Sequence, residues 1–119
     1  MRRGVWSAWR EPWDGPLGEW AEWVRELVEA SGVYEIRERG RSAVVYVGES
    51  HTGKLYGTLT RHFQWWRGPT AGASYNRRAV KIRVMLTSPS LAKAKQDARI
   101  ARLRPRDNVA ANPDADVPF

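Results

Sequence analysis

The chain has 119 residues, 42% of them apolar and 28% charged, which suits a single domain with a modest core. It contains no cysteine, which excludes a disulfide framework and a thiolate zinc site and favours a reducing, cytoplasmic setting. No stretch is long and apolar enough to cross a membrane, and the basic start lacks the apolar run of a signal peptide.

The formal net charge of +7 is unevenly distributed along the chain. Residues 31–108 hold sixteen basic and five acidic side chains, whereas the segments before and after them are acidic. A basic centre suits a polyanionic partner such as DNA, although an Arg-rich solvated surface without a partner has the same composition. No basic stretch has a clean apolar face, so we expect no membrane binding.

The first 30 residues are rich in tryptophan and predict a helical extension. Asp14-Gly15-Pro16 is typical of a helix start, and Ser31-Gly32 of a helix end. Between them, apolar side chains recur at helical spacing on one face, and the other side is acidic. We therefore expect this helix to pack on the core, or to dock a protein partner or a second copy of the chain. Base stacking is an alternative for the first tryptophans, Trp6, Trp9 and Trp13.

The next segment predicts a β-hairpin. Val33–Ile36 and Ala43–Val47 are runs of β-branched and aromatic residues, and the polar, glycine-containing Arg39–Ser42 between them has hairpin length. Antiparallel pairing would bring Tyr34 and Tyr46 close together on one face. Two half-buried strand tyrosines without a chemical role would show the same pattern.

The sequence next predicts a loop after Gly48 and a helix from about Lys54 to Trp66. On that helix Leu55, Leu59 and Phe63 form a buried stripe, and Thr58, Arg61 and His62 share another face.

Beyond a second loop over residues 67–74, the alternation from Ala79 to Leu86 predicts a third strand with one face exposed to solvent. Ser88-Pro89 opens a final helix to about Leu103, Arg104-Pro105 ends it, and we expect a frayed chain beyond Asn108. This order predicts an α+β domain in which helices flank a small three-stranded antiparallel sheet.

Three blocks of this sequence resemble the GIY-YIG nuclease superfamily. Gly32-Val33-Tyr34, eleven residues and then Tyr46-Val47-Gly48 resemble its signature, and Leu55–Phe63 resembles the helix that follows. Gln96-x-x-x-Ile100-x-x-x-Arg104-Pro105-x-x-Asn108 is similar to the final helix and its Pro-x-x-Asn end. The resemblance covers residues 31–108, between the Trp-rich extension (1–30) and a C-terminal tail (109–119). It implies an endonuclease that hydrolyses DNA phosphodiester bonds with a divalent metal, Mg or Mn.

The resemblance also implies roles for single residues. Tyr34 and Tyr46 match the two family tyrosines, and Tyr46 is the expected activator of water. A tyrosine with a pKa near ~10 is a weak base, so it would need metal or cationic help. His62 matches the helix histidine, which would bond a tyrosine or the phosphate. The predicted catalytic residues are Tyr34, Tyr46, Arg61, His62 and Gln96, with Gln96 in the metal position.

Two positions depart from the family pattern. The catalytic arginine falls on Thr58, so Arg61 or Lys54 would have to supply the positive charge. The metal-binding glutamate falls on Gln96, whose amide lacks the charge that holds Mg or Mn. Asp97 is a poor substitute because one helical step rotates it by ~100°.

Helical spacing with Ala92, Ile100 and Leu103 places Gln96 on the inward side of the final helix, with Asp97 turned away. We therefore expect Gln96 to point toward Tyr34, Tyr46 and His62.

We expect nucleic acid to be bound chiefly by the basic residues of the centre. Besides Arg61, the predicted contacts are Lys54, Arg67, Arg77, Arg78, Lys81, Arg83 and Asn108. Two other functions stay open. One is a catalytically inactive domain that binds nucleic acid, which Thr58 and Gln96 favour, and the other is a protein-interaction module.

Overall fold

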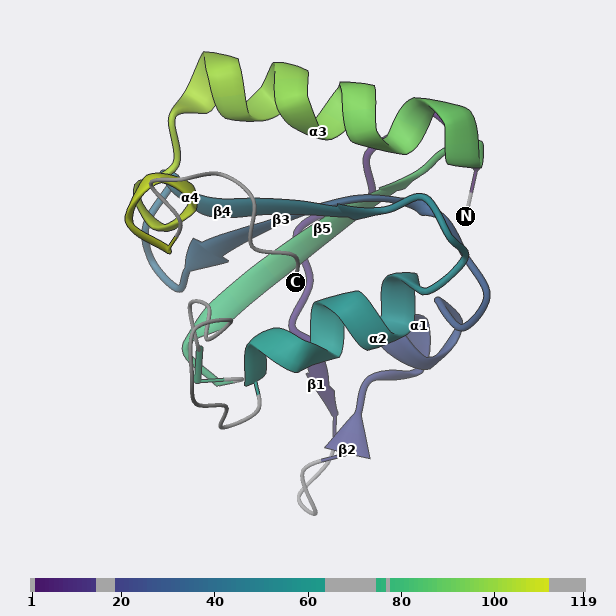
Figure 1. The fold of residues 1–119 in the computed structure, drawn as a ribbon. Helices are drawn as coiled ribbons and strands as arrows, with labels where there is room; N and C mark the ends of the chain where they lie inside the picture. The colour runs from purple at the N-terminus through teal and green to yellow at the C-terminus, as the bar shows by residue number, and fades with distance from the viewer. Residues whose placement is uncertain (1, 15–18, 64–74, 77, 112–119) are drawn as a thin grey trace.

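The structure is a computed structural model that describes residues 2–14, 19–63, 75–76 and 78–111. Its centre is a three-stranded sheet made of β3 (Gly32–Glu38), β4 (Val44–Ser50) and β5 (Val80–Leu86). The strands are antiparallel and lie in the order β4-β3-β5, so the hairpin strand β3 is central (Figure 1). This arrangement confirms the predicted α+β fold with its small antiparallel sheet. No helix in the described ranges has the length and apolar character needed to span a membrane.

The helices cover both faces of the sheet. The long helix α3 (Pro89–Leu103) lies along one face, and α1 (Glu22–Arg25) and α2 (Leu55–Thr60) lie on the other (Figure 1). A 3₁₀ turn, η1 (Arg61–Phe63), continues α2, and the rest of the predicted helix to Trp66 lies outside the described residues. The predicted bounds of the final helix are confirmed.

Strand alternation sorts the core into two layers. Tyr34 and Ile36 of β3 join Ile82 and Val84 of β5 in the layer that α1 and α2 cover, and each of these four side chains is fully buried. Glu35, between Tyr34 and Ile36, points to the opposite layer beneath α3.

The C-terminal end of α3 has an unusual backbone. Arg104 adopts the left-handed conformation (φ 46°, ψ 60°), and its N–H donates to the carbonyl oxygen of Ile100 at 2.8 Å. Glycine or asparagine is usual at such a helix end, and another side chain there costs ~1–2 kcal/mol. Pro105 follows, and α4 (Arg106–Ala111) begins directly after it. The chain is thus helical through Ala111, beyond the expected start of the tail.

The first 30 residues differ most from prediction. The described helix is only the four residues of α1, and Glu19–Trp20 forms the short strand β2, paired with β1 (Trp13–Asp14). The predicted helix start around Gly15 and Pro16 lies outside the described residues. Tertiary contacts replace helical ones here, because Trp20 packs edge-on against Phe63 with ring centroids 5.4 Å apart.

The segment before β1 covers the outer edge of the sheet. The N–H groups of Gly4, Ser7 and Arg10 donate to carbonyl oxygens of β5 at 2.8–2.9 Å. This pairing blocks an edge strand that would otherwise offer free backbone groups. Residues Val24 and Leu27 reach the main core, so the first 30 residues belong to the same packed unit as the sheet.

A buried carboxylate organises the layer beneath α3. Glu35 is fully buried and binds two guanidinium groups, that of Arg83 at 2.7 Å and that of Arg99 of α3 at 2.6 Å. Arg83 also lies over the rings of Trp6 and Trp9, with its guanidinium carbon 4.4 and 5.0 Å from the ring centroids. Glu35 therefore ties together the sheet, α3 and the N-terminal segment through charge-assisted bonds and cation–π contacts.

Replacing Glu35 with Gln should lower the free energy of unfolding by about 2–4 kcal/mol, because the two arginines would lose their shared anion in a buried site. The arginine side chains are 22% exposed, so we expect less than for a fully enclosed pair. Glu38→Gln is the matched control in the same strand, because its pair with Arg106 is 37% and 62% exposed and is worth ~0–1 kcal/mol. Urea unfolding measures both. Equal losses would contradict this account.

Candidate active site

Tyr34 and Tyr46 lie side by side on the sheet face that α2 covers. Tyr34 pairs across the strands with Gly48, and Ile36 pairs with Tyr46, so the two tyrosines are diagonal neighbours. Their rings are stacked with centroids 6.2 Å apart and planes inclined at 30°. The expectation from the hairpin pattern is confirmed.

Gly48 makes room for the ring of Tyr34. A Cβ atom at position 48 would lie 2.3 Å from the Cζ and Oη atoms of Tyr34, so the ring rests directly on the glycine backbone. The second glycine of the quoted signature is therefore a steric requirement of the first tyrosine.

His62 completes the cluster from the turn after α2. Its Nε2 is hydrogen-bonded to the hydroxyl of Tyr34 at 2.7 Å, and its ring centroid lies 4.4 Å from that of Tyr46. Tyr34 and His62 are fully buried, and Tyr46 is 4% exposed. Three side chains from separate stretches of sequence thus meet in one enclosed polar cluster.

Burial controls protonation in this cluster. It raises the pKa of Tyr34 well above 10, and the positive charge of the exposed Arg61 opposes that shift. Burial also raises the pKa of Tyr46, and the negative charge of Glu49 adds to the effect. Both hydroxyls therefore stay protonated at neutral pH, and Arg61 lies close enough to act electrostatically on Tyr34.

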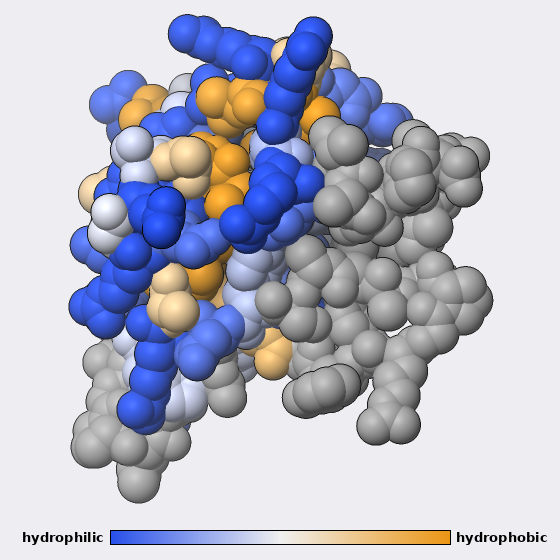
Figure 2. Space-filling model, turned by 90° about the vertical axis from the view of Figure 1, so that its left-hand side faces the viewer, coloured by the Kyte–Doolittle hydropathy of each residue, from blue (hydrophilic) through white to orange (hydrophobic). Residues whose placement is uncertain are grey.

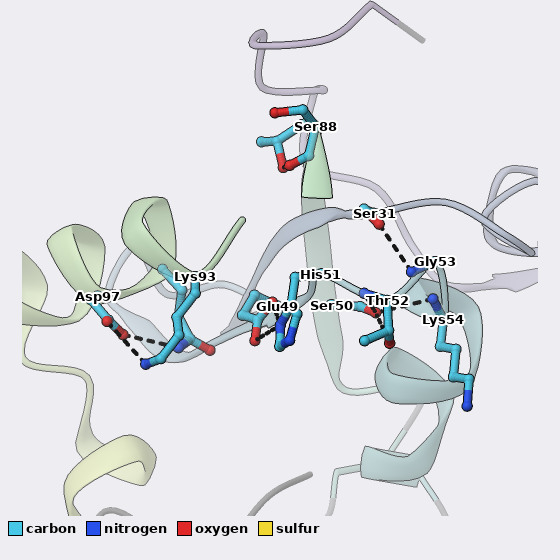
Figure 3. A network of polar contacts seen from close by, with 12 residues as sticks. Ser31, Glu49, Ser50, His51, Thr52, Gly53, Lys54, Ser88, Lys93 and Asp97 are labelled. Carbon is cyan, nitrogen blue, oxygen red and sulfur yellow. Dashed lines mark hydrogen bonds and ion pairs between the residues drawn. The ribbon is translucent and has the colours of Figure 1, made fainter. Parts of the chain in front are cut away.

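The loop from β4 to α2 is fixed by serine hydroxyls, which sets where α2 begins. The Oγ of Ser50 accepts from the N–H of Lys54 at 3.0 Å, and the Oγ of Ser31 accepts from the N–H of Gly53 at 3.0 Å (Figure 3). Arg61 and His62 follow about two helical turns after Lys54, so these bonds help to position them. Thr58 lies between, half-buried in α2.

Tyr75 and Asp107 extend the cluster, and sequence analysis missed both. The Tyr75 hydroxyl donates to the Oδ2 of Asp107 at 2.6 Å, and the Tyr75 ring lies 6.1 Å from that of His62. Burial alone would raise the pKa of Asp107, but hydrogen bonds from Arg106 and Tyr75 outweigh it and hold that pKa below its usual value. Tyr75 follows a glycine-rich loop without a repeating pattern, so the sequence offers no signal for it.

Asn108 acts on the backbone of β4. Its Oδ1 accepts from the N–H of Val47 at 2.8 Å, and its Nδ2 donates to the carbonyl oxygen of Val47 at 2.9 Å. The amide thus replaces a neighbouring strand at the outer edge of β4. Because both ends of the side chain are engaged, the predicted contact of Asn108 with nucleic acid is replaced by a structural role.

Gln96 lies on the inward side of α3 as expected, but not beside the tyrosines. Ala92, one turn earlier, is fully buried, and Gln96 is half-buried, whereas the Asp97 side chain is 55% exposed and paired with Lys93. However, α3 lies on the sheet face opposite α2 (Figure 1), whereas the tyrosine rings contact His62 at the end of α2. The expectation that Gln96 points toward Tyr34, Tyr46 and His62 is therefore wrong, because the strand between them separates the two layers.

The strand β4 lies at one edge of the sheet. Glu49 of β4 is bonded to His51 at 3.1 Å, next to the start of α2, and its charge still influences Tyr46 (Figure 3). Within the described residues no group of three or more His, Cys, Asp or Glu side chains is arranged to hold a metal. A Mg²⁺ ion that keeps most of its waters needs only one or two carboxylates. Whether α3 can supply a carboxylate ligand at this edge therefore depends on the residue at position 96.

The structure describes only part of the predicted nucleic-acid contacts. Arg67 and Arg77 lie outside the described residues, and Arg83 is committed to Glu35. Arg78 is exposed, Lys81 is half-buried on the α3 side, and Lys54 is exposed at the start of α2.

Comparison with known proteins adds no relative. No protein-family model matches the sequence, and no curated protein matches it, so motif and geometry carry the functional argument.

Replacing Gly48 with Ala should lower the free energy of unfolding by about 1–3 kcal/mol, because the new methyl group overlaps the Tyr34 ring and would push it away from His62. Gly57→Ala is the matched control, since its Cβ would meet open space in α2 and should stabilise the helix by ~0.5–1 kcal/mol. Thermal and urea unfolding of both variants measure the difference. If Gly48→Ala is as stable as the parent, the ring does not rest on Gly48.

Proposed function

We propose that this chain is a GIY-YIG-type domain that binds DNA and is built to hydrolyse its phosphodiester bonds. The observation that carries the proposal is the hydrogen bond between Tyr34 and His62, with the Tyr46 ring packed against both. Residues from two of the three resembling blocks, the signature and the helix that follows it, meet in this cluster. The proposal includes a divalent metal ion, Mg or Mn, as the cofactor and a cytoplasmic location for the protein.

Within this proposal, the enclosed Tyr34 and His62 position the site and Tyr46 acts on the substrate. Tyr46 keeps its proton at neutral pH, so its hydroxyl would first donate a hydrogen bond that orients water or a phosphate oxygen. Arg61 would stabilise negative charge on the phosphate, taking the role of the arginine that Thr58 lacks. Its electrostatic effect on Tyr34 favours it over Lys54, which lies at the other end of α2.

The metal position is the weak point of this site. Gln96 offers one neutral amide oxygen, and its Nε2 donates to Asp97 at 3.2 Å. The carboxylates of Glu49 and Asp97 are engaged by His51 and Lys93. A bound divalent cation would supply positive charge to the phosphate and lower the pKa of an attacking water. Such an ion would lie around the edge of β4, where groups from the two layers can reach one substrate.

A second candidate function is DNA binding without cleavage. It is favoured by the two neutral residues, Thr58 and Gln96, at positions where the family carries charged groups. We do not propose a protein-interaction module, because the long Trp-rich helix that it requires is absent from the described residues, and Trp6 and Trp9 contact the protein's own arginines.

Replacing Gln96 with Glu should raise the rate of DNA cleavage in Mn²⁺ at least about tenfold above the parent, a barrier change of ~1.4 kcal/mol, because it adds one anionic oxygen ligand. Cleavage of single-stranded, duplex and branched DNA is measured by gel assay, with and without Mn²⁺. Ala98→Glu adds the same charge on the exposed side of α3 and should have no effect. Binding without cleavage in every variant would establish the second candidate instead.

In the Gln96→Glu background, Tyr46→Phe should remove cleavage and leave DNA affinity nearly unchanged, because only one hydroxyl is lost. Rates and anisotropy-based affinities are measured on the same substrate. A double variant that keeps more than about a tenth of the rate, less than ~1.4 kcal/mol in barrier, would show that Tyr46 has no direct part in the reaction.

A further inference from the structure

Arginines gather at the end of the molecule where the β3–β4 turn meets the junction of α3 and α4. We call this surface the hairpin end, and its exposed arginines are Arg39, Arg41, Arg78, Arg102, Arg104 and Arg106. Bonds between the elements hold it together. The Arg39 N–H donates to the carbonyl oxygen of Ala79 at 2.8 Å, and Arg106 binds Glu38 at 2.9 Å. Figure 2 views this side of the molecule and shows hydrophilic residues around a smaller apolar strip.

The positive charge at the hairpin end is only partly neutralised. Arg39 is paired with Glu11, and Arg106 is paired with Glu38 and Asp107. By contrast, four of the exposed arginines have no ion pair with any carboxylate in the described part of the chain. Arg78 lies over the Trp13 ring, 5.2 Å from its centroid, and the other three are Arg41, Arg102 and Arg104.

The backbone of Arg104 is a second, independent observation. Its left-handed conformation is one that glycine adopts at the lowest cost, yet the chain places a long cationic side chain there. Strain of this kind is found mainly at functional positions. Arginines near a helix C-terminus also complement the helix dipole, so stability has to be measured beside any binding effect.

The hairpin end is continuous with the tyrosine–histidine cluster. Arg106 is bonded to Asp107, Asp107 accepts from the Tyr75 hydroxyl, and the Tyr75 backbone N–H donates to the carbonyl oxygen of His62 at 2.8 Å. A continuous chain of bonds therefore links Arg106 of this surface to His62, whose ring lies beside that of Tyr46.

We infer that Arg41, Arg102 and Arg104 form the main phosphate-contacting surface for a DNA strand that enters the Tyr46 site. This inference rests on the proposed function, because it states where the nucleic acid of that site lies. This surface takes the place of the predicted nucleic-acid contacts, which are scattered along the sequence. Arg83 is excluded from it, because its charge is used within the fold by Glu35.

The test compares two triple variants that lose the same charge. One is Arg41→Gln/Arg102→Gln/Arg104→Gly, and the control is Arg3→Gln/Arg25→Gln/Lys95→Gln, whose parent residues are exposed away from the hairpin end. Fluorescence anisotropy with a labelled duplex, in EDTA to prevent cleavage, gives the dissociation constant across a range of salt. Circular dichroism confirms that each variant is folded.

We expect the hairpin-end variant to bind at least about tenfold more weakly than the parent at ~0.1 M salt. Its slope of log K against log salt should be shallower by roughly 0.9 for each lost phosphate contact. The control should stay within about threefold of the parent and keep its slope. An equal loss in the control would overturn the inference and leave the proposed function standing. No binding by the parent at low salt would overturn both. Competition by polyglutamate as strong as by DNA would show that the surface does not select phosphates.

The single variant Arg104→Gly separates binding from folding. It should unfold at a temperature equal to or above that of the parent, because glycine suits the left-handed backbone, and it should still lose affinity about two- to fivefold as expected for one phosphate contact. Unchanged affinity, or a loss that only follows a fall in stability, would assign Arg104 to the helix end alone.

Discussion

The hydrogen bond between Tyr34 and His62 joins the central strand of the sheet to the turn that ends α2, and the candidate site depends on it. Tyr34 can reach His62 only because Gly48 leaves its ring lying flat on β4. Tyr46 then fills the remaining space beside both rings. Since a buried polar group without a partner is costly, the pair also fixes where α2 packs on the sheet. This one hydrogen bond therefore fixes both how α2 packs on the sheet and where the Arg61 side chain projects from the surface.

The sheet separates two polar systems of different character. On one side lies the cluster of the tyrosines and His62, in which burial keeps the tyrosine hydroxyls protonated. On the other side Glu35 is enclosed by Arg83 and Arg99, so much of the basic charge there is used to hold the fold together. A count of basic residues along the chain therefore overstates what is free for a polyanion. Arg41, Arg102 and Arg104, around the β3–β4 turn and the α3–α4 junction, are among the exposed arginines that are not used in this way.

Much of the fold follows from local sequence. Alternation specified β3, β4 and β5, so the closeness of Tyr34 and Tyr46 on one face was predictable. Pro89 and Pro105 bracketed α3. Two failures have physical causes. The helical spacing around Trp20 predicted a helix, but Trp20 instead pairs with Trp13 in a short strand and packs on Phe63. The periodicity of α3 correctly gave the inward side of Gln96, but periodicity does not say which face of a sheet a helix covers. The contact of Tyr75 with Asp107 is long-range and has no local signature.

The most direct test of the central claim is to map where DNA contacts the folded chain. Backbone ¹H–¹⁵N NMR spectra recorded during titration with a short duplex, without metal, would give this map residue by residue. The account predicts shifts concentrated at β4 around Tyr46, at Arg61 and His62, and along residues 102–108. Shifts concentrated instead at β1, β2 and α1, or no shifts at low salt, would contradict it.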